Sequence, residues 1–270
     1  MNYIIVGGDA RMAHLAEHLR QMGRGAQRAL AGGEDAATVM AALEILRGAD
    51  AIVTNCPPRA RGAKLSMDDI LRFADPKARV YLCGPAEAGV EDDRVVDLWR
   101  DEALLRENAR LTAEGALCAA MQASRRGLRD VNCLVIGWGR VGSALAKLLA
   151  AMGARVTVVS RSGAHRDCAA GHGATAVPPE ALPRVLPGSN LIFSTPPAMV
   201  LDAERLRHVD PDALIIDLAS PPYGVDLRAA WQRGIRAWRE PGLPGRHCPD
   251  SAGLALARAI IRHEGEDRHE

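Results

Sequence analysis

Three glycines with the spacing G-x-G-x-x-G lie in Gly137-Trp138-Gly139-Arg140-Val141-Gly142. The apolar run before them is typical of a buried parallel strand, and apolar residues at helical spacing follow. In such a strand–turn–helix unit the first glycine allows a tight turn, the second lets the backbone approach a pyrophosphate, and the third permits close helix packing. N–H groups at the helix start hold the phosphate charge. The motif predicts a dinucleotide site; the alternative is a structural unit that binds no cofactor.

The next strand of this unit ends in Ser160-Arg161-Ser162. A site for NAD usually carries Asp or Glu at this position, where the carboxylate binds the ribose hydroxyls. A carboxylate would repel a 2′-phosphate, whereas an arginine between two hydroxyls would bind one. We therefore expect NADP as the cofactor.

Further candidates follow other predicted strands, because ligands of open α/β sheets bind beyond the carboxyl ends of the strands. Thr195, Pro196 and Pro197 could line the nicotinamide, or could merely end their strand. The predicted substrate-binding residues are Asp9, Arg11, Asn55 and Arg59. The two arginines could bind carboxylates in bidentate fashion. A solvated surface role is the alternative for either arginine, although the strand-end position of Arg11 favours binding.

Three residues are candidates for proton transfer: Glu114, Asp217 and His247. Asp217 ends an apolar strand, which places it near the cofactor, but its carboxylate could instead accept hydrogen bonds from the next loop. His247 lies in a loop rich in proline and glycine, from residue 239 to 249. The six cysteines show no metal-binding spacing, so we expect no metal.

The elements that position these residues alternate between strands and helices. In the first part of the chain we expect strands at 3–6, 51–54, 80–83 and 95–98, with helices at 12–22, at 36–47 and from 66. A helix from 104 to 126, with an entry or kink near 108–115, leads to strands near 132–137, 155–160, 174–177, 190–195, 213–218 and 235–238. A last helix covers 251–263 and is long enough to pack back on the first domain.

This pattern predicts an α/β protein with two Rossmann-like, doubly wound parallel-sheet domains and a cleft between them. Residues 1–108, with the C-terminal helix in 250–270, would form a flavodoxin-like substrate domain, and residues 109–249 the NADP-binding domain. The hydrophobic fraction of 48% is ordinary for a soluble globular protein. A net charge of +1 and 3% aromatic residues argue against nucleic-acid binding.

No apolar run is long enough to span a bilayer, and the first strand begins too close to Met1 for a signal peptide. Several cysteines lie inside apolar runs, as buried reduced thiols do. We therefore expect a cytoplasmic protein.

Several stretches together resemble the A subunits of dipicolinate synthases, over essentially the full chain. These stretches are Gly7-Gly8-Asp9-Ala10-Arg11, Thr112-Ala113-Glu114-Gly115, the glycine motif, Ser160–His165, Asp217–Ser220, Pro241-Gly242-Leu243-Pro244-Gly245 and Ser251-Ala252-Gly253. More distantly, the layout is similar to that of D-2-hydroxyacid dehydrogenases.

The resemblance implies an NADP-dependent oxidation of dihydrodipicolinate, a small dicarboxylate, to dipicolinate in sporulation. It also implies that the partner is a flavoprotein-like B subunit. Whether the chain also forms a homo-oligomer stays open from the sequence. The chain departs from the family where Pro221-Pro222-Tyr223 replaces a more basic turn, and where Asp250 replaces a lysine. Two alternatives therefore stay open: a dehydrogenase for another small carboxylate, and a catalytically silent cofactor-binding subunit.

Overall fold

The chain divides into two compact units in the computed structural model, which describes residues 1–29, 43–55, 65–84 and 91–266. Unit 1 consists of Met1–Asn108 with Pro244–Glu270, and unit 2 of Ala109–Leu243. Each unit is built on one parallel sheet, five-stranded in unit 1 and six-stranded in unit 2. The predicted α/β class with two parallel-sheet domains is confirmed.

The sheet of unit 2 has the strand order β11-β10-β9-β6-β7-β8. Counted in chain order from β6, this is the 3-2-1-4-5-6 order of dinucleotide-binding domains. All six predicted strands are present, with small shifts at their ends: β6 (Asn132–Ile136), β7 (Arg155–Val159), β8 (Thr175–Val177), β9 (Leu191–Ser194), β10 (Leu214–Asp217) and β11 (Arg236–Arg239).

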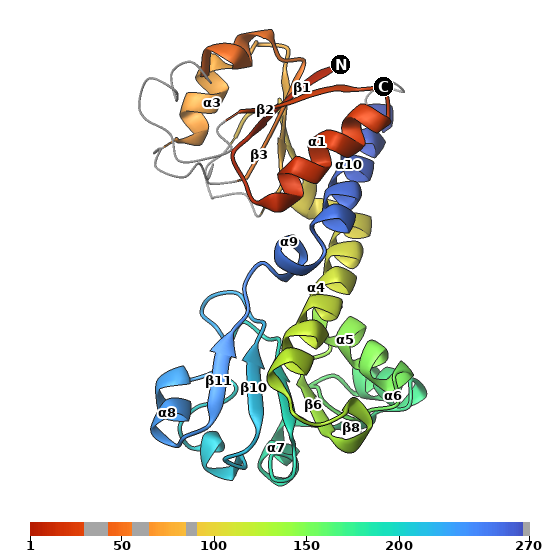
Figure 1. The fold of residues 1–270 in the computed structure, drawn as a ribbon, viewed down its shortest axis with the longest axis vertical. Helices are drawn as coiled ribbons and strands as arrows, with labels where there is room; N and C mark the ends of the chain where they lie inside the picture. The colour runs from red at the N-terminus through yellow and green to blue at the C-terminus, as the bar shows by residue number, and fades with distance from the viewer. Residues whose placement is uncertain (30–42, 56–64, 85–90, 267–270) are drawn as a thin grey trace. The chain divides into compact units, whose positions relative to one another are not determined.

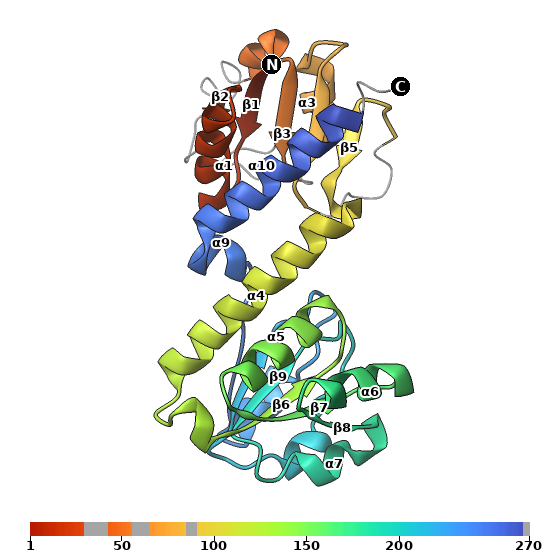
Figure 2. The same cartoon turned by 90° about the vertical axis from the view of Figure 1, so that its right-hand side faces the viewer.

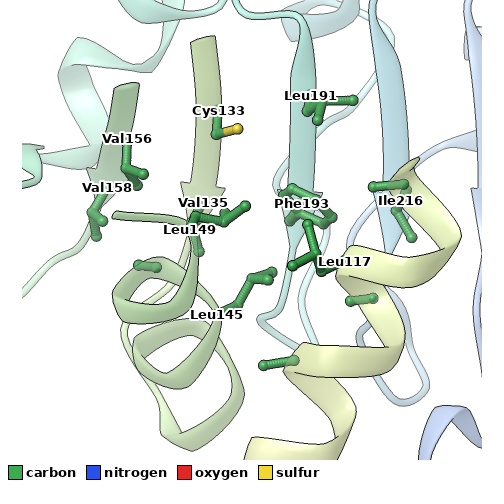
Figure 3. Close-up of a cluster of buried hydrophobic side chains, with 14 of the residues drawn as sticks. Leu117, Cys133, Val135, Leu145, Leu149, Val156, Val158, Leu191, Phe193 and Ile216 are labelled. Atoms are coloured by element: carbon green, nitrogen blue, oxygen red, sulfur yellow. The ribbon is translucent and has the colours of Figure 1, made fainter. Parts of the chain in front are cut away.

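Helices cover both faces of this sheet, because successive strand residues point to opposite faces and both sets are apolar. On one face, α4 (Glu102–Ala123), α5 (Arg140–Ala151) and α6 (Gly163–Gly171) pack on side chains such as Val135 and Phe193. Figure 3 shows Leu117 of α4 and Leu145 of α5 meeting these strands. On the other face, α7 (Leu182–Val185) and α8 (Leu227–Gln232) pack on Leu134 and Ile215. The sheet therefore lies inside its unit, and a ligand can reach it only at the ends of the strands.

The sheet of unit 1 has the order β2-β1-β3-β4-β5, which is the flavodoxin-like arrangement. Its strands are β1 (Asn2–Val6), β2 (Gly25–Ala29), β3 (Ala51–Thr54), β4 (Arg79–Leu82) and β5 (Val95–Asp97). β2 was not predicted, because it is a polar edge strand in which only Ala29 is buried.

Two long helices lie side by side on one face of the unit 1 sheet, α1 (Ala10–Gln21) and α10 (Pro249–Glu266) (Figures 1 and 2). α3 (Met67–Phe73) covers the other face. Gly253 makes the close approach possible, because a Cβ there would lie 2.7 Å from Cβ of His14. Asp250 Oδ1 lies 3.2 Å from Nδ1 of His14 and 3.1 Å from Nε2 of His18, both on α1. Asp250 therefore links the start of α10 to α1.

Several helices differ from their predicted limits. α4 is one uninterrupted helix that starts earlier than predicted and has no break at 108–115. The predicted loop 239–249 contains α9 (Leu243–His247), and α10 starts and ends outside the predicted 251–263. Most of the predicted helix 36–47 lies outside the described residues. Single 3-10 turns occur at η1 (Leu46–Gly48), η2 (Leu98–Arg100), η3 (Leu128–Asp130), η4 (Pro179–Ala181) and η5 (Arg205–His208).

Candidate dinucleotide-binding site

The glycine turn between β6 and α5 has the geometry that its sequence predicts. Gly137 adopts a φ of 99°, in the left-handed region that favours glycine. A Cβ on Gly137 would also collide with the hydroxyl of Thr195, and one on Gly142 with the carbonyl of Gly137. Contacts within the protein therefore account for two of the three glycines.

Gly139 has no such internal reason, because a Cβ there would meet no described protein atom within 4 Å. It is the N-cap of α5, and within the described chain no side chain caps this helix. The first N–H groups of a helix lack intrahelical partners and attract anions. Open space above Gly139 and an uncapped helix start fit a bound pyrophosphate.

Trp138 takes part in the site through its backbone alone. Its side chain is 8% exposed and belongs to the hydrophobic core beneath the turn. The indole meets His172 edge-on at 6.5 Å between ring centroids, and the ammonium of Lys147 lies 5.9 Å from it. The neighbouring Arg140 is exposed. The turn is thus anchored to the core by its second residue.

The end of β7 presents hydroxyls and guanidinium groups. Ser160 is buried, and Arg161 is exposed, with a side chain that makes no hydrogen bond or ion pair with any part of the chain that the structure describes. Ser162 caps α6 by accepting a hydrogen bond from the His165 N–H at 3.3 Å. Arg166 donates to the carbonyl oxygens of Ser160 (2.8 Å) and Arg161 (2.9 Å). Arg166 therefore holds the backbone in place, while the Arg161 side chain is available to a ligand.

Thr195 supports the glycine turn from β9. Its N–H and its hydroxyl both donate to the carbonyl oxygen of Ile136, at 3.1 and 2.9 Å. Pro196 also packs here, since a Cβ on Gly137 would lie 3.2 Å from its ring. Pro197 is exposed. Both Thr195 and Pro196 therefore contact the dinucleotide turn.

Asp217 ends β10 and is 1% exposed. Its carboxylate accepts hydrogen bonds from the N–H groups of Ala219 (3.2 Å), Gly224 (3.1 Å) and Val225 (3.2 Å). These bonds match the structural alternative for Asp217, because three donors occupy a carboxylate that fixes the loop 218–225. The structure thus argues against Asp217 as a catalytic acid or base.

Arg239 is a candidate site residue that the sequence analysis does not name. It ends β11 and pairs in register with Asp217 of β10, which in turn pairs with Ser194 of β9. Its guanidinium lies over the ring of Tyr223, 3.9 Å from the centroid, and its Nε lies 3.8 Å from Asp217 Oδ2. The side chain is 39% exposed. A positive charge therefore stands at the carboxyl edge of the sheet, where the turn at 221–223 itself supplies none.

The other two proton-transfer candidates lie on helices. Glu114 is on α4 and forms an ion pair with Arg110, one turn earlier. His247 ends α9, and its Nε2 is buried without a hydrogen-bond partner in the described residues. Glu114 belongs to unit 2 and His247 to unit 1.

Asp9 and Arg11 form a closed pair at the carboxyl edge of the unit 1 sheet. Arg11 Nε donates to both carboxylate oxygens of Asp9 (2.9 and 3.0 Å), and Nη2 donates at 2.8 Å. Burial alone would raise the pKa of Asp9, but the bonds from Arg11 outweigh it and the pKa is lowered. This corrects the expectation of a free bidentate clamp, because Asp9 already occupies that edge of the guanidinium.

The pair also explains one glycine of the segment Pro241-Gly242-Leu243-Pro244-Gly245. A Cβ on Gly245 of α9 would lie 2.8 Å from Asp9 Oδ2 and 3.2 Å from Arg11 Nε. Gly245 and the Asp9–Arg11 pair therefore meet inside unit 1. Asn55 follows β3, with its Oδ1 4.0 Å from the Cβ position of Gly84. The predicted residue Arg59 lies outside the described residues.

Among the described residues, no group of three His, Cys, Asp or Glu side chains is suited to hold a metal ion. Among the same residues, no helix has the length and apolar character needed to cross a membrane.

Known proteins resemble this chain in sequence and fold. Residues 103–222 match the NAD-binding domain of D-isomer-specific 2-hydroxyacid dehydrogenases. The A subunit of dipicolinate synthase from Bacillus subtilis (strain 168) is 33% identical over 169 residues, which cover 63% of this chain and 57% of that protein. The chain thus matches somewhat more than half the length of this curated relative.

Two crystal structures extend the likeness of fold to the whole chain. The A subunit of dipicolinate synthase from Bacillus halodurans has a TM-score of 0.74, with 25% identity over 97% of both chains. The corresponding dipicolinate synthase structure from Bacillus subtilis has a TM-score of 0.80, with 23% identity over 100% of this chain and 98% of that one. The resemblance to dipicolinate synthase A subunits is confirmed, and residues 103–222 match a nicotinamide-cofactor-binding domain of the hydroxyacid dehydrogenase type, a match that supports an oxidoreductase.

Proposed function

We propose that this chain is an NADP-dependent oxidoreductase that acts as the A subunit of a dipicolinate synthase and oxidises dihydrodipicolinate to pyridine-2,6-dicarboxylate. The observation that carries the proposal is the 33% identity over 169 residues with a protein of that name. The name of that relative also supports a partner B subunit for this chain.

In this proposal the cofactor binds at the glycine turn of unit 2. The N–H groups at the start of α5 and the open space at Gly139 receive the pyrophosphate. Arg161, with Ser160 and Ser162, binds the 2′-phosphate, because no carboxylate stands at the end of β7 to repel it. When bound, NADP supplies the acceptor for a hydride from the dihydropyridine ring. A proton leaves the same ring, and the product is aromatic.

Arg239 is the proposed ligand of a substrate carboxylate in unit 2. The ring of Tyr223 fixes the plane of the guanidinium, and Asp217 lies on its Nε side. The two terminal nitrogens then remain for a carboxylate, which a guanidinium binds through two parallel hydrogen bonds. Asn55 and the remaining Nη1 of Arg11 are proposed contacts in unit 1, together with Arg59. Glu114 and His247 remain proposed proton acceptors.

The direct test is to supply the purified chain, with and without a B subunit, with NADP and freshly prepared dihydrodipicolinate. NADPH is followed by its absorbance, and dipicolinate by chromatography. We expect equal amounts of the two products. Gly139→Ala is the variant that links the products to the glycine turn. Its added methyl group meets no described protein atom, so the unfolding temperature should stay unchanged while cofactor binding and turnover are lost. Cofactor binding without either product, in every mixture, would contradict the proposed reaction.

A dehydrogenase for another small carboxylate is the second candidate. It is favoured by the turn Pro221-Pro222-Tyr223, which itself carries no cation and which Arg239 of β11 contacts through the ring of Tyr223. A screen of small mono- and dicarboxylates that follows NADPH distinguishes the two, because activity with another acid and none with dihydrodipicolinate supports this second candidate.

A further inference from the structure

A pocket of about 450 Å³ lies at the amino edge of the unit 2 sheet. It is formed where α4 ends and where β6, β9, β10 and β11 begin. The glycine turn is at the other end of the same strands. Asn190 lines the pocket and Thr195 contacts the glycine turn, and these residues are separated by roughly 16 Å of extended chain. The pocket is therefore distinct from the candidate dinucleotide site.

Positive charge gathers around this pocket. Its lining includes three arginines, Arg125, Arg126 and Arg236, against one carboxylate, that of Asp212. Every residue of unit 2 is described, and within this unit the side chains of Arg125 and Arg126 make no hydrogen bond and no ion pair. All three arginines are exposed, and their like charges around one cavity favour an anion in it.

Of these three arginines, only Arg236 makes a hydrogen bond to the C-terminal end of α4. Arg236 Nη2 donates to the carbonyl oxygen of Ala123, the last residue of α4, at 3.4 Å. A cation is favourable at a helix C-terminus, where carbonyl groups lack partners. Arg125 and Arg126 make no such bond. Arg236 is thus held in position, and the other two guanidiniums remain free to bind a ligand.

The rest of the lining is suited to a small organic molecule. Val131, Leu191 and Leu214 are buried beneath the pocket and give it an apolar floor. Asn190 accepts a hydrogen bond from the Asn132 N–H through Oδ1 at 2.8 Å, which leaves its amide NH₂ as a donor. A volume of this size lies in the range of small-molecule pockets, roughly 300–1,000 Å³.

We propose that this pocket binds a small organic anion that carries two or more acidic groups. Guanidinium groups bind carboxylates and phosphates alike through paired N–H donors. The ligand is therefore defined by its charge and size: two acidic groups reach the arginines, and a compact body rests on the apolar floor. The site does not depend on the proposed reaction.

Titration calorimetry on the full chain tests this proposal with two probes, citrate for carboxylates and inorganic pyrophosphate for phosphates. The double variant Arg125→Ala/Arg126→Ala is compared with Arg184→Ala/Arg228→Ala, which removes the same charge from exposed positions outside the pocket. We expect at least one probe to bind saturably, with a Kd that rises about tenfold or more in the pocket variant and about twofold or less in the control. Because pyrophosphate can also occupy the glycine turn, only the component lost in the pocket variant counts.

The probe that binds identifies the acidic group. Three outcomes would overturn the proposal: neither probe binds at millimolar concentration, both double variants weaken binding equally, or the pocket variant binds as tightly as the unmutated chain. Binding of poly-glutamate alone, with neither small anion, would also overturn it and would assign the arginines to an acidic protein partner.

Discussion

Replacing Arg161 by alanine isolates the residue on which the choice of NADP depends. Its side chain is exposed and has no partner among the described residues, so the substitution removes no contact within the protein. Arg166 would be a poor probe, because its guanidinium holds the carbonyl oxygens of Ser160 and Arg161. An effect of Arg161→Ala on the cofactor is therefore an effect on binding, with the fold unchanged.

The size of the effect follows from the exposure of the site. A hydrogen bond to a charged group contributes about 1.5–3 kcal/mol. Solvent and salt screen an exposed contact, which favours the lower end of this range. We expect a loss of about 1.5 kcal/mol, which is about a tenfold weaker Kd for NADPH. NADH lacks the 2′-phosphate and should change by less than about twofold.

The assay is a fluorescence titration with NADPH and with NADH at two salt concentrations. The matched control is Arg184→Ala, an exposed arginine on α7 away from the end of β7. The Kd for NADH divided by the Kd for NADPH should fall about tenfold in Arg161→Ala and stay unchanged in Arg184→Ala. Raising the salt concentration should bring the NADPH affinities of Arg161→Ala and the unmutated chain closer together. Equal affinity of the unmutated chain for both cofactors, or an unchanged ratio in Arg161→Ala, would refute the reasoning.

Three further predictions concern packing and ionisation. Gly253→Ala should lower the free energy of unfolding, measured in urea, by about 1–3 kcal/mol, because the added methyl group collides with α1. Gly171→Ala, in open space at the end of α6, should instead raise this free energy by about 0.5–1 kcal/mol. A change of the same sign in both variants would contradict the packing of α1 against α10. Asp9→Asn should destabilise the protein at neutral pH and progressively less as the pH falls below about 4. Burial would raise the pKa of Asp9, but the bonds from Arg11 outweigh it and lower the pKa, so the ionised Asp9 stabilises the fold and this contribution is lost when the carboxylate is protonated. A difference in unfolding free energy between Asp9→Asn and the unmutated chain that does not change with pH, measured by urea titration, would exclude this. Burial raises the pKa of the Cys83 thiol to about 12, so iodoacetamide at pH 8 should modify Cys83 only after unfolding, as mass spectrometry of the peptides can show, and rapid labelling of the native chain would count against it.

The strands of unit 2 were predictable because they are apolar on both faces. Leu134 and Val135 are adjacent in sequence, face opposite layers and are both fully buried, so the whole run is apolar. β2 lacks this signal, because an edge strand with one buried residue shows no apolar pattern. α9 was hidden by the proline and glycine in its five residues, Leu243–His247, which resemble a loop.

The local parts of the site were predicted and the non-local parts were not. The glycine turn is recognisable from the spacing within residues 137–142, although Thr195 also supports it. Arg239 reaches Tyr223 and Asp217 only because β10 and β11 pair in register, which no local pattern indicates. The Asp9–Arg11 pair is local, but an arginine next to a strand end predicts ligand binding and internal pairing equally well. Sequence spacing thus locates charge without telling which partner neutralises it.

The interleaved order of the two units along the chain has a consequence for biosynthesis. The segment that forms unit 2 is finished once Leu243 has been added, whereas the core of unit 1 lacks Ala255, Leu256 and Ile260 of α10, which are translated after unit 2. Domains fold as units while the chain emerges from the ribosome, usually with the earlier sequence first. Here unit 1 departs from that order: the core around β1 is completed only when α10 has been translated, after the whole of unit 2, and the apolar face of α1 stays uncovered until then.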